Sequence, residues 1–193
     1  MVTHGNTPST PPRLHTTLLQ RFGATLRQYR QQRGLTQKAL ATSIGIRRSS
    51  YLSEIELGKR NITVLTLLHL AWALDIPAAR LLAGLDTDAP RAPLTPYDPL
   101  SSRGTRDATP SVTPSPQPDN ATPLLQLLGT TLRHYRQHVG LSQPALAART
   151  GLNPTYIGQI EQGQRNVSVL SLLRMAEALG ISLSSLLTPL ETR

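Results

Sequence analysis

The sequence contains no cysteine among its 193 residues, and aromatic side chains make up only 4% of it. Without cysteine, the chain cannot form disulfides, zinc–thiolate sites, iron–sulfur clusters or a cysteine nucleophile. No apolar run approaches the length of about 18 residues that a transmembrane helix needs. The polar, proline-rich first 13 residues also lack the apolar stretch of a secretory signal. We therefore expect a protein of the reducing cytoplasm with no membrane partner.

Acidic residues are also scarce, because 11 Asp and Glu stand against 20 Lys and Arg, which gives a net charge of +9 and a pI of about 11.0. This imbalance makes nucleic acid the first partner to consider, with an anionic membrane surface as the alternative. Enzyme signatures are missing too, since there is no phosphate-binding glycine loop, HExxH motif or paired-carboxylate motif. His134 and His138 are interpreted as a solvated helix face. We expect no enzymatic activity, cofactor or metal.

Proline, in contrast, is abundant, and nine of the 16 prolines lie between residues 86 and 123. Ser, Thr and Asp fill most of the rest of this segment, which has a net charge of −2. Such a composition cannot bury enough apolar surface to offset the entropy of ordering, so it predicts a disordered linker. Most of the positive charge lies in the flanks, with +8 in residues 13–85 and +3 in residues 124–193.

The two flanks are copies of each other. Residues 21–46 match residues 127–152 at 14 of 26 positions, and residues 51–82 match residues 156–187 at 16 of 32 positions. Identity near one half implies one fold used twice, and a period of about 105 residues is too long for a solenoid. The expected organisation is an N-terminal arm (1–14), a first domain (15–85), the linker (86–123), a second domain (124–188) and a tail (189–193).

Each copy is predicted to form five helices and no strand. In the first copy, apolar residues at helical spacing predict a helix over 17–33, and glycines then delimit helices over 37–44 and 49–57. Thr63 is the expected cap of the fourth helix, and Pro77 the expected first residue of the fifth. The second copy repeats this pattern of helix ends. The predicted fold class is therefore all-α.

A short helix, a turn containing glycine and a second short helix form the helix-turn-helix pattern, whose second helix enters the major groove. Gly34-Leu-Thr-Gln37 and Tyr51-Leu-Ser-Glu-Ile-Glu-Leu-Gly-Lys-Arg-Asn61 carry this pattern in the first copy. Gly140-Leu-Ser-Gln143 and Tyr156-Ile-Gly-Gln-Ile-Glu-Gln-Gly-Gln-Arg-Asn166 repeat it. These motifs resemble the Cro/C1 (Xre) family of DNA-binding domains. The resemblance implies two five-helix domains like that of lambda repressor, with double-stranded DNA as the partner.

Candidate DNA-binding residues fall in three places in each copy: the start of the second helix, the start of the third, and the loop after it. Helix N-termini favour anions, so the first place suits a phosphate, whereas the second suits base edges. In the first copy the candidates are Thr36, Gln37, Lys38, Arg47, Arg48, Ser49, Ser50, Tyr51, Glu54, Lys59 and Arg60. In the second copy they are Ser142, Gln143, Asn153, Thr155, Tyr156, Gln159 and Arg165.

The base-reading chemistry differs between the copies. Arg48 can bond the acceptor edge of guanine and Glu54 can accept from the cytosine amino group, whereas Gln159 suits adenine. We therefore predict different half-site preferences, although Arg47 and Arg48 would also suit a basic turn without sequence preference. Lysines at 38 and 59 are replaced by proline and glutamine in the second copy. The first domain should therefore supply most of the salt-dependent affinity.

Two further features are predicted to have structural roles. The resemblance implies that Arg30 on the first helix pairs with Glu56 at the end of the third, and that Arg136 pairs with Glu161 in the same way. The alternative is unrelated surface charges. The single tryptophan, Trp72, aligns with a glutamate in the second copy. It is a candidate interface residue because aromatic side chains concentrate at contacts, and the alternative is that it covers its own domain.

Together these features predict a cytoplasmic, nucleoid-associated, sequence-specific transcriptional regulator that acts as a repressor. As a flexible coil, the linker spans about 35 Å, close to the separation of about 34 Å between adjacent half-sites, and it could also bridge distant ones. A homodimer is left open, and no small-molecule effector site is evident. One alternative is that one domain binds DNA while the other is an interaction or dimerisation module. Another is a nucleoid-type binder without sequence preference.

Overall fold

The structure is a computed structural model that describes residues 14–83, residue 85 and residues 121–191. Within these ranges the chain forms ten α-helices and no strand, apart from one isolated β-bridge. The predicted all-α class, with five helices in each copy, is confirmed. The expected arm, apart from Leu14, and nearly all of the expected linker lie outside the described residues. No single described helix is both long and apolar enough to cross a membrane, and only the helices Val169–Leu179 and Leu183–Glu191 taken together, across a 116° bend, pass that test.

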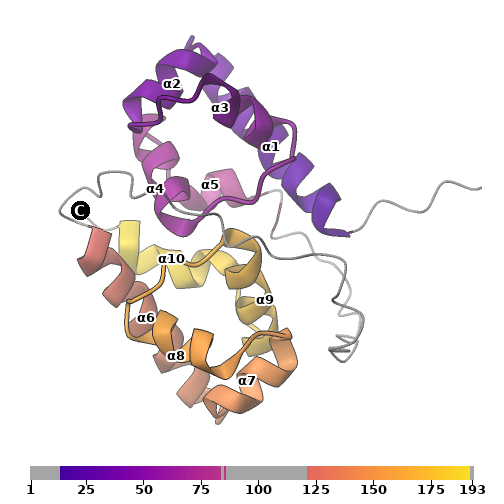
Figure 1. Cartoon of the computed structure of the whole chain (residues 1–193), viewed down its shortest axis with the longest axis vertical. Coiled ribbons are helices and arrows are strands. Elements are labelled where there is room, and N and C mark those ends of the chain that lie inside the picture. The colour runs from indigo at the N-terminus through magenta and orange to yellow at the C-terminus, as the bar shows by residue number, and fades with distance from the viewer. Residues whose placement is uncertain (1–13, 84, 86–120, 192–193) are drawn as a thin grey trace, which may run out of the picture.

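Each copy contributes five helices (Figure 1). The first copy forms α1 (Leu14–Gln32), α2 (Gln37–Ser43), α3 (Ser49–Glu56), α4 (Val64–Ala73) and α5 (Ala78–Leu82). The second forms α6 (Ala121–His138), α7 (Gln143–Thr150), α8 (Pro154–Glu161), α9 (Val169–Leu179) and α10 (Leu183–Glu191).

Two boundaries differ from the expected organisation by more than one residue. Helix α6 begins at Ala121, so the last three residues of the expected linker are helical. Helix α10 continues to Glu191, through the first residues of the expected tail, even though Pro189 lies inside it. Packing explains the second difference, because Leu190 is buried and an apolar residue at that position extends the inward face of α10.

The helix caps largely follow the sequence. The hydroxyls of Thr36 and Ser142 accept hydrogen bonds from backbone N–H groups three residues later. Thr63 occupies the N-cap position of α4, but its hydroxyl contacts other side chains and makes no capping bond. The expectation for Pro77 is off by one residue, because it lies at the N-cap of α5 and the first helical residue is Ala78.

A glycine inside the first helix of each copy sets how closely that helix approaches the recognition helix. A methyl group built on Gly23 would lie 2.5 Å from the carbonyl oxygens of Ile55 and Glu56, which is an impossible contact. Gly129 meets the end of α8 in the same way. Any larger residue would therefore push the third helix of the copy away from the first. These glycines thus allow the close packing of the recognition helix on the first helix.

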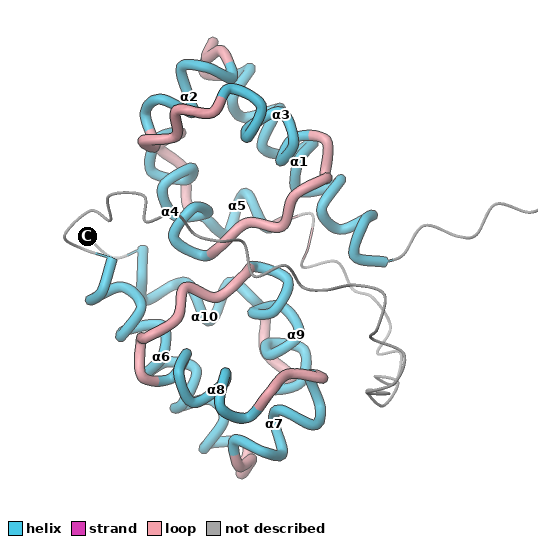
Figure 2. Tube along the Cα trace, viewed as in Figure 1, coloured by secondary structure: helices cyan, strands magenta, loops and turns pink. Residues whose placement is uncertain are grey.

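The two copies pack against each other (Figure 2). Helix α5 contacts α10, and the chain segments that precede α4 and α9 meet in the bridge between Thr63 and Ser168. Most buried apolar side chains of both copies form one continuous cluster, and Leu65 and Leu125 form a small second cluster. The described parts of the chain therefore make a single body with two helix-turn-helix units at opposite ends.

Candidate nucleic-acid interface

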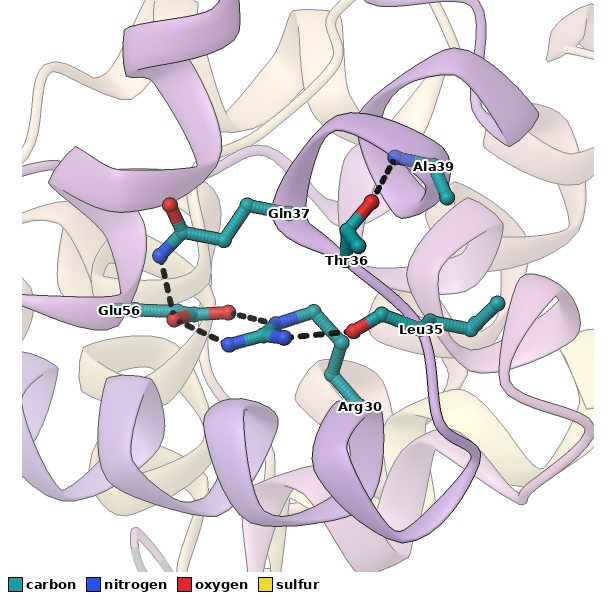
Figure 3. Close-up of polar contacts among 6 residues, drawn as sticks. All are labelled: Arg30, Leu35, Thr36, Gln37, Ala39 and Glu56. Carbon is teal, nitrogen blue, oxygen red and sulfur yellow. Dashed lines mark hydrogen bonds and ion pairs between the residues drawn. The ribbon is translucent and has the colours of Figure 1, made fainter.

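In the first copy, a buried ion pair holds the helix-turn-helix together (Figure 3). Arg30 on α1 donates from Nε to Glu56 Oε1 at 2.6 Å and from Nη2 to Oε2 at 3.1 Å. Its Nη1 donates to the carbonyl of Leu35 at 2.6 Å. The Glu56 side chain is only 4% exposed. One guanidinium thus joins α1, the loop before α2 and the end of α3, and all its bonds are charge-assisted or reach a backbone carbonyl.

Gln37, the first residue of α2, completes this cluster. Its Nε2 donates to Glu56 Oε2 at 2.8 Å (Figure 3). The bond fixes the start of α2 to the end of α3, and so it helps to set the angle between the two helices. The side chain is therefore placed on the ion pair in this structure, and the phosphate contact expected for Gln37 stays a prediction.

The second copy repeats the arrangement. Arg136 donates to the two oxygens of Glu161 at 2.5 and 2.9 Å and to the carbonyl of Leu141 at 2.6 Å. Gln143 donates to the same carboxylate at 2.9 Å. The hydrogen bond with Glu161 raises the pKa of the Arg136 guanidinium above its ordinary value, although partial burial opposes the shift. Both helix-turn-helix units therefore have the same internal scaffold.

The recognition helix of the first copy turns its apolar side inward and leaves its start exposed. Leu52 and Ile55 are buried in the core, whereas Arg47, Arg48 and Ser50 are exposed. Arg48 occupies the N-cap position without a side-chain capping bond, so its guanidinium is not used to begin the helix. The candidate Ser49 is the first residue of α3, and its side chain lies outside the described part of the structure.

The recognition helix of the second copy begins differently. Asn153 is its N-cap, and its side-chain oxygen accepts from the backbone N–H of Thr155 at 2.8 Å. Pro154 takes the first helical position, which suits its missing N–H. The capping bond holds the Asn153 amide over the first turn of α8, and Thr155 beside it is exposed. The two recognition helices therefore present an arginine at one N-cap and a carboxamide at the other.

A contact between the recognition helix and the loop after it was missed in the sequence. Arg60 pairs with Glu54 at 2.6 Å, and its guanidinium also lies 4.9 Å from the centre of the Tyr51 ring. In the second copy, Arg165 donates to the Gln159 side-chain oxygen at 2.8 Å. The sequence carried a signal of this contact, because an acceptor side chain precedes an arginine by six residues in both copies. Glu54 and Arg60, which we treated separately, therefore form one unit.

The remaining candidates lie where the sequence pattern puts them. Lys38 and Lys59 are exposed, and Tyr156 is half-buried on α8 as Tyr51 is on α3.

Trp72 is half-buried, and its ring centre lies 5.6 Å from that of His69, whose pKa is lowered by burial. Trp72 also lines a shallow cleft together with Glu191 from α10 of the other copy.

The described residues contain no group of three or more His, Asp or Glu side chains placed to hold a metal ion. The rings of His134 and His138 lie 6.4 Å apart on α6. This geometry agrees with neighbouring positions on one helix face and brings no third ligand to the pair.

Comparisons with known proteins identify both copies. Two helix-turn-helix domain families match the chain, one over residues 23–86 and the other over residues 127–186. A segment of 64 residues, 33% of the chain, is 38% identical to an uncharacterised helix-turn-helix transcriptional regulator of Sinorhizobium fredii and covers 83% of that protein. The chain belongs to the Cro/C1 (Xre) family of helix-turn-helix transcriptional regulators.

Other members of this family show the same one-domain match. The control protein C.SmaI of Serratia marcescens is 43% identical over 63 residues, which are 33% of this chain and 75% of that protein. The restriction-modification controller protein C.AhdI of Aeromonas hydrophila, a solved structure, is 45% identical over 32% of this chain and 94% of that one, with a TM-score of 0.32. Each of these matches spans about one copy, whereas the present Xre-family chain contains two.

Proposed function

We propose that this regulator binds a specific double-stranded DNA sequence through both helix-turn-helix domains and represses transcription. The observation that carries the proposal is that each copy has an internally braced helix-turn-helix with the start of its recognition helix exposed. A protein held on promoter DNA blocks polymerase by occupying its site, which requires no further contact. Such a protein would act in the cytoplasm, at the nucleoid, and we propose no enzymatic activity.

The base contacts come from the exposed starts of α3 and α8. In the first copy, Arg48 and Ser50 would face the base edges, and the carboxylate of Glu54 would be presented together with the Arg60 guanidinium. In the second copy, Asn153, Thr155 and Gln159 would do so. Because arginine and amide side chains favour different base edges, the copies would prefer different half-sites.

The contacts with the phosphate backbone of DNA come from the N-termini of α2 and α7 and from the loops after α3 and α8. The exposed amides of a helix N-terminus attract phosphate, and basic loop residues neutralise it. Lys38, Lys59 and Arg60 supply three positive charges to this role in the first copy. Arg165 is the matching charge in the second, so the first copy would contribute more of the salt-dependent affinity.

Binding selection on random DNA with the intact protein tests the proposal. We expect one enriched sequence. The variant Arg48→Ala should relax the protein's base preference at one half-site and weaken binding to the enriched sequence by about 1–3 kcal/mol. Arg80→Ala is the charge-matched control, because Arg80 is exposed on α5 and outside α2 and α3. Binding that shows no enriched sequence would refute the proposal and support a nucleoid-type binder.

A second candidate is that only the first copy binds DNA while the second acts as an interaction or dimerisation module. The observation that favours it is the lower charge of the second copy, +3 against +8. Asn153→Ala combined with Gln159→Ala in the intact protein separates the two proposals. Unchanged affinity and sequence preference would support the interaction module, whereas loss of preference at one half-site would support DNA binding by both copies.

A further inference from the structure

The contact between the copies is reciprocal. Val64 donates its backbone N–H to the carbonyl of Val167 at 2.9 Å, and Val169 donates to the carbonyl of Ile62 at 2.8 Å. Aligning the copies pairs Val64 with Val169 and Ile62 with Val167, so each bond is the counterpart of the other. A contact in which each partner uses the same surface is isologous, and it implies a two-fold relation.

A second pair of bonds follows the same rule. The side-chain oxygen of Asn166 accepts from the backbone N–H of Leu65 at 3.3 Å, and that of Asn61 accepts from Leu170 at 3.4 Å. Asn61 and Asn166 are aligned, as are Leu65 and Leu170. Each asparagine is also the residue that directly follows the arginine of its recognition loop, so the loop that would contact DNA runs straight into the contact between the copies.

Apolar packing supports the hydrogen bonds. Ile62, Val64, Val167 and Val169 are each at most 1% exposed. The last helices of the two copies, α5 and α10, are also aligned with each other and pack together. The surface that each copy uses for this contact is therefore already occupied by the other copy of the same chain.

The arrangement of the helices shows the same two-fold relation. In Figure 1, α1 lies to the right in the upper copy and α6 to the left in the lower one, and α4 and α9 exchange sides in the same way. The copies are thus related by an approximate two-fold rotation about the viewing direction. Such a rotation preserves depth, so α3 and α8 lie at the same depth in this view, one toward each end of the molecule.

We infer that one chain forms a single DNA-binding unit that reads one asymmetric site, built of two unequal half-sites in inverted orientation at a fixed separation. This inference rests on the proposed function. The docked contact, rather than the connecting segment, sets the orientation and spacing. A pair of domains held only by a flexible connection of this length would accept direct repeats and variable spacing.

The first experiment measures binding of the intact protein to rearranged versions of its selected site. One version inverts a half-site to give a direct repeat, one inserts 5 base pairs between the half-sites, and one inserts 10. We expect each change to weaken binding by about 100-fold, because the second half-site is lost and tethering no longer contributes. Losses below tenfold for the direct repeat and the 10-base-pair insertion would overturn the inference.

The second experiment needs no DNA and uses the absence of native cysteine. Thr63 and Ser168 form a non-hydrogen-bonded antiparallel pair, in which the side chains lie close enough for a disulfide. The double variant Thr63→Cys with Ser168→Cys should form a disulfide within one chain on mild oxidation. The matched control, Thr42→Cys with Ala148→Cys, places aligned cysteines on α2 and α7 at opposite ends (Figure 1), and should not form one within the chain.

The two results are then combined. The oxidised double variant should bind the selected site within about threefold of its reduced form, and each single cysteine variant controls for the substitution itself. Loss of binding on oxidation would show that the docked form is not the DNA-bound form. A disulfide between two chains, or none, would overturn the single-chain contact. If binding selection enriches no DNA sequence while the disulfide forms within the chain, the proposed function is refuted but the contact between the copies is supported.

Discussion

The two copies agree in the interior of the helix-turn-helix and in the segments that dock them, and they differ at the starts of their recognition helices and in the length of the last helix. The ion pair, the glutamine bond to it and the glycine beneath the recognition helix recur with nearly the same geometry. By contrast, the recognition residues differ in chemistry, and the last helix has five residues in one copy and nine in the other. The difference teaches that holding the helices and the copies together constrains the sequence in both copies, whereas the exposed starts of the recognition helices can change separately.

The largest expected effect tests the shared interior. Replacing Glu56 or Glu161 by alanine leaves a buried arginine without its partner, so each substitution should lower the free energy of unfolding by about 3–5 kcal/mol. Urea unfolding of the intact chain measures this loss. Glutamine at the same position retains an acceptor and should cost less. Losses that differ strongly between the two sites would break the equivalence of the two interiors.

The next effect tests the divergence in DNA reading. Glu54→Gln gives the first copy the side chain of the second, and the amide oxygen can still accept from Arg60. It should change base preference at one position of one half-site by about 1–3 kcal/mol. Competition binding with single base-pair changes measures this, and Gln159→Glu is the reciprocal exchange. The same change on α9, Glu177→Gln, should leave the preference as it was, and a shift there would contradict the assignment.

A smaller effect concerns phosphate contact. Lys59→Gln removes one charge from the loop after α3, and the slope of log affinity against log salt should fall in magnitude by about 0.9. Gln164→Lys makes the opposite exchange in the second copy and should raise it by a similar amount. Binding over a salt series measures both slopes. If neither slope changes, the loops do not contact the DNA backbone.

The smallest effect concerns a turn in which the two copies have different residues at the left-handed position. After α4, Asp75 has a φ of 52°, whereas the aligned residue after α9 is Gly180. Glycine adopts this left-handed region without strain, so Asp75→Gly should raise the free energy of unfolding by about 0.5 kcal/mol. The lost ion pair with Arg33 is exposed and contributes little. Thermal unfolding measures the change, and a destabilised variant would show that this ion pair outweighs the strain.

The sequence predicted those features that depend on local pattern. Periodic apolar residues and capping residues placed the helices within a few positions, and the motifs around Arg30 and Glu56 placed both residues in the helix-turn-helix. The aligned glycines Gly23 and Gly129 were a signal of close helix approach that we did not use. A glycine inside a helix carries an energetic cost, so its presence in both copies pointed to a packing reason.

The contact between the copies could not be predicted in the same way. Ile62 and Val167 look like ordinary apolar residues before a helix, because no local spacing distinguishes a residue buried in its own domain from one buried against a domain about 105 residues away. The same limit explains Thr63, which was expected to cap α4. Its hydroxyl instead accepts from the Asn166 amide of the other copy at 3.0 Å.

Joining both halves of an isologous contact in one polypeptide also changes the expected dose response. Two separate chains would have to associate before both half-sites are filled, and promoter occupancy would then rise steeply with protein concentration. Here the association is intramolecular and does not depend on protein concentration, so occupancy of one site should follow a simple hyperbola. We expect such a regulator to respond to its own abundance in a graded way, down to a few copies per cell.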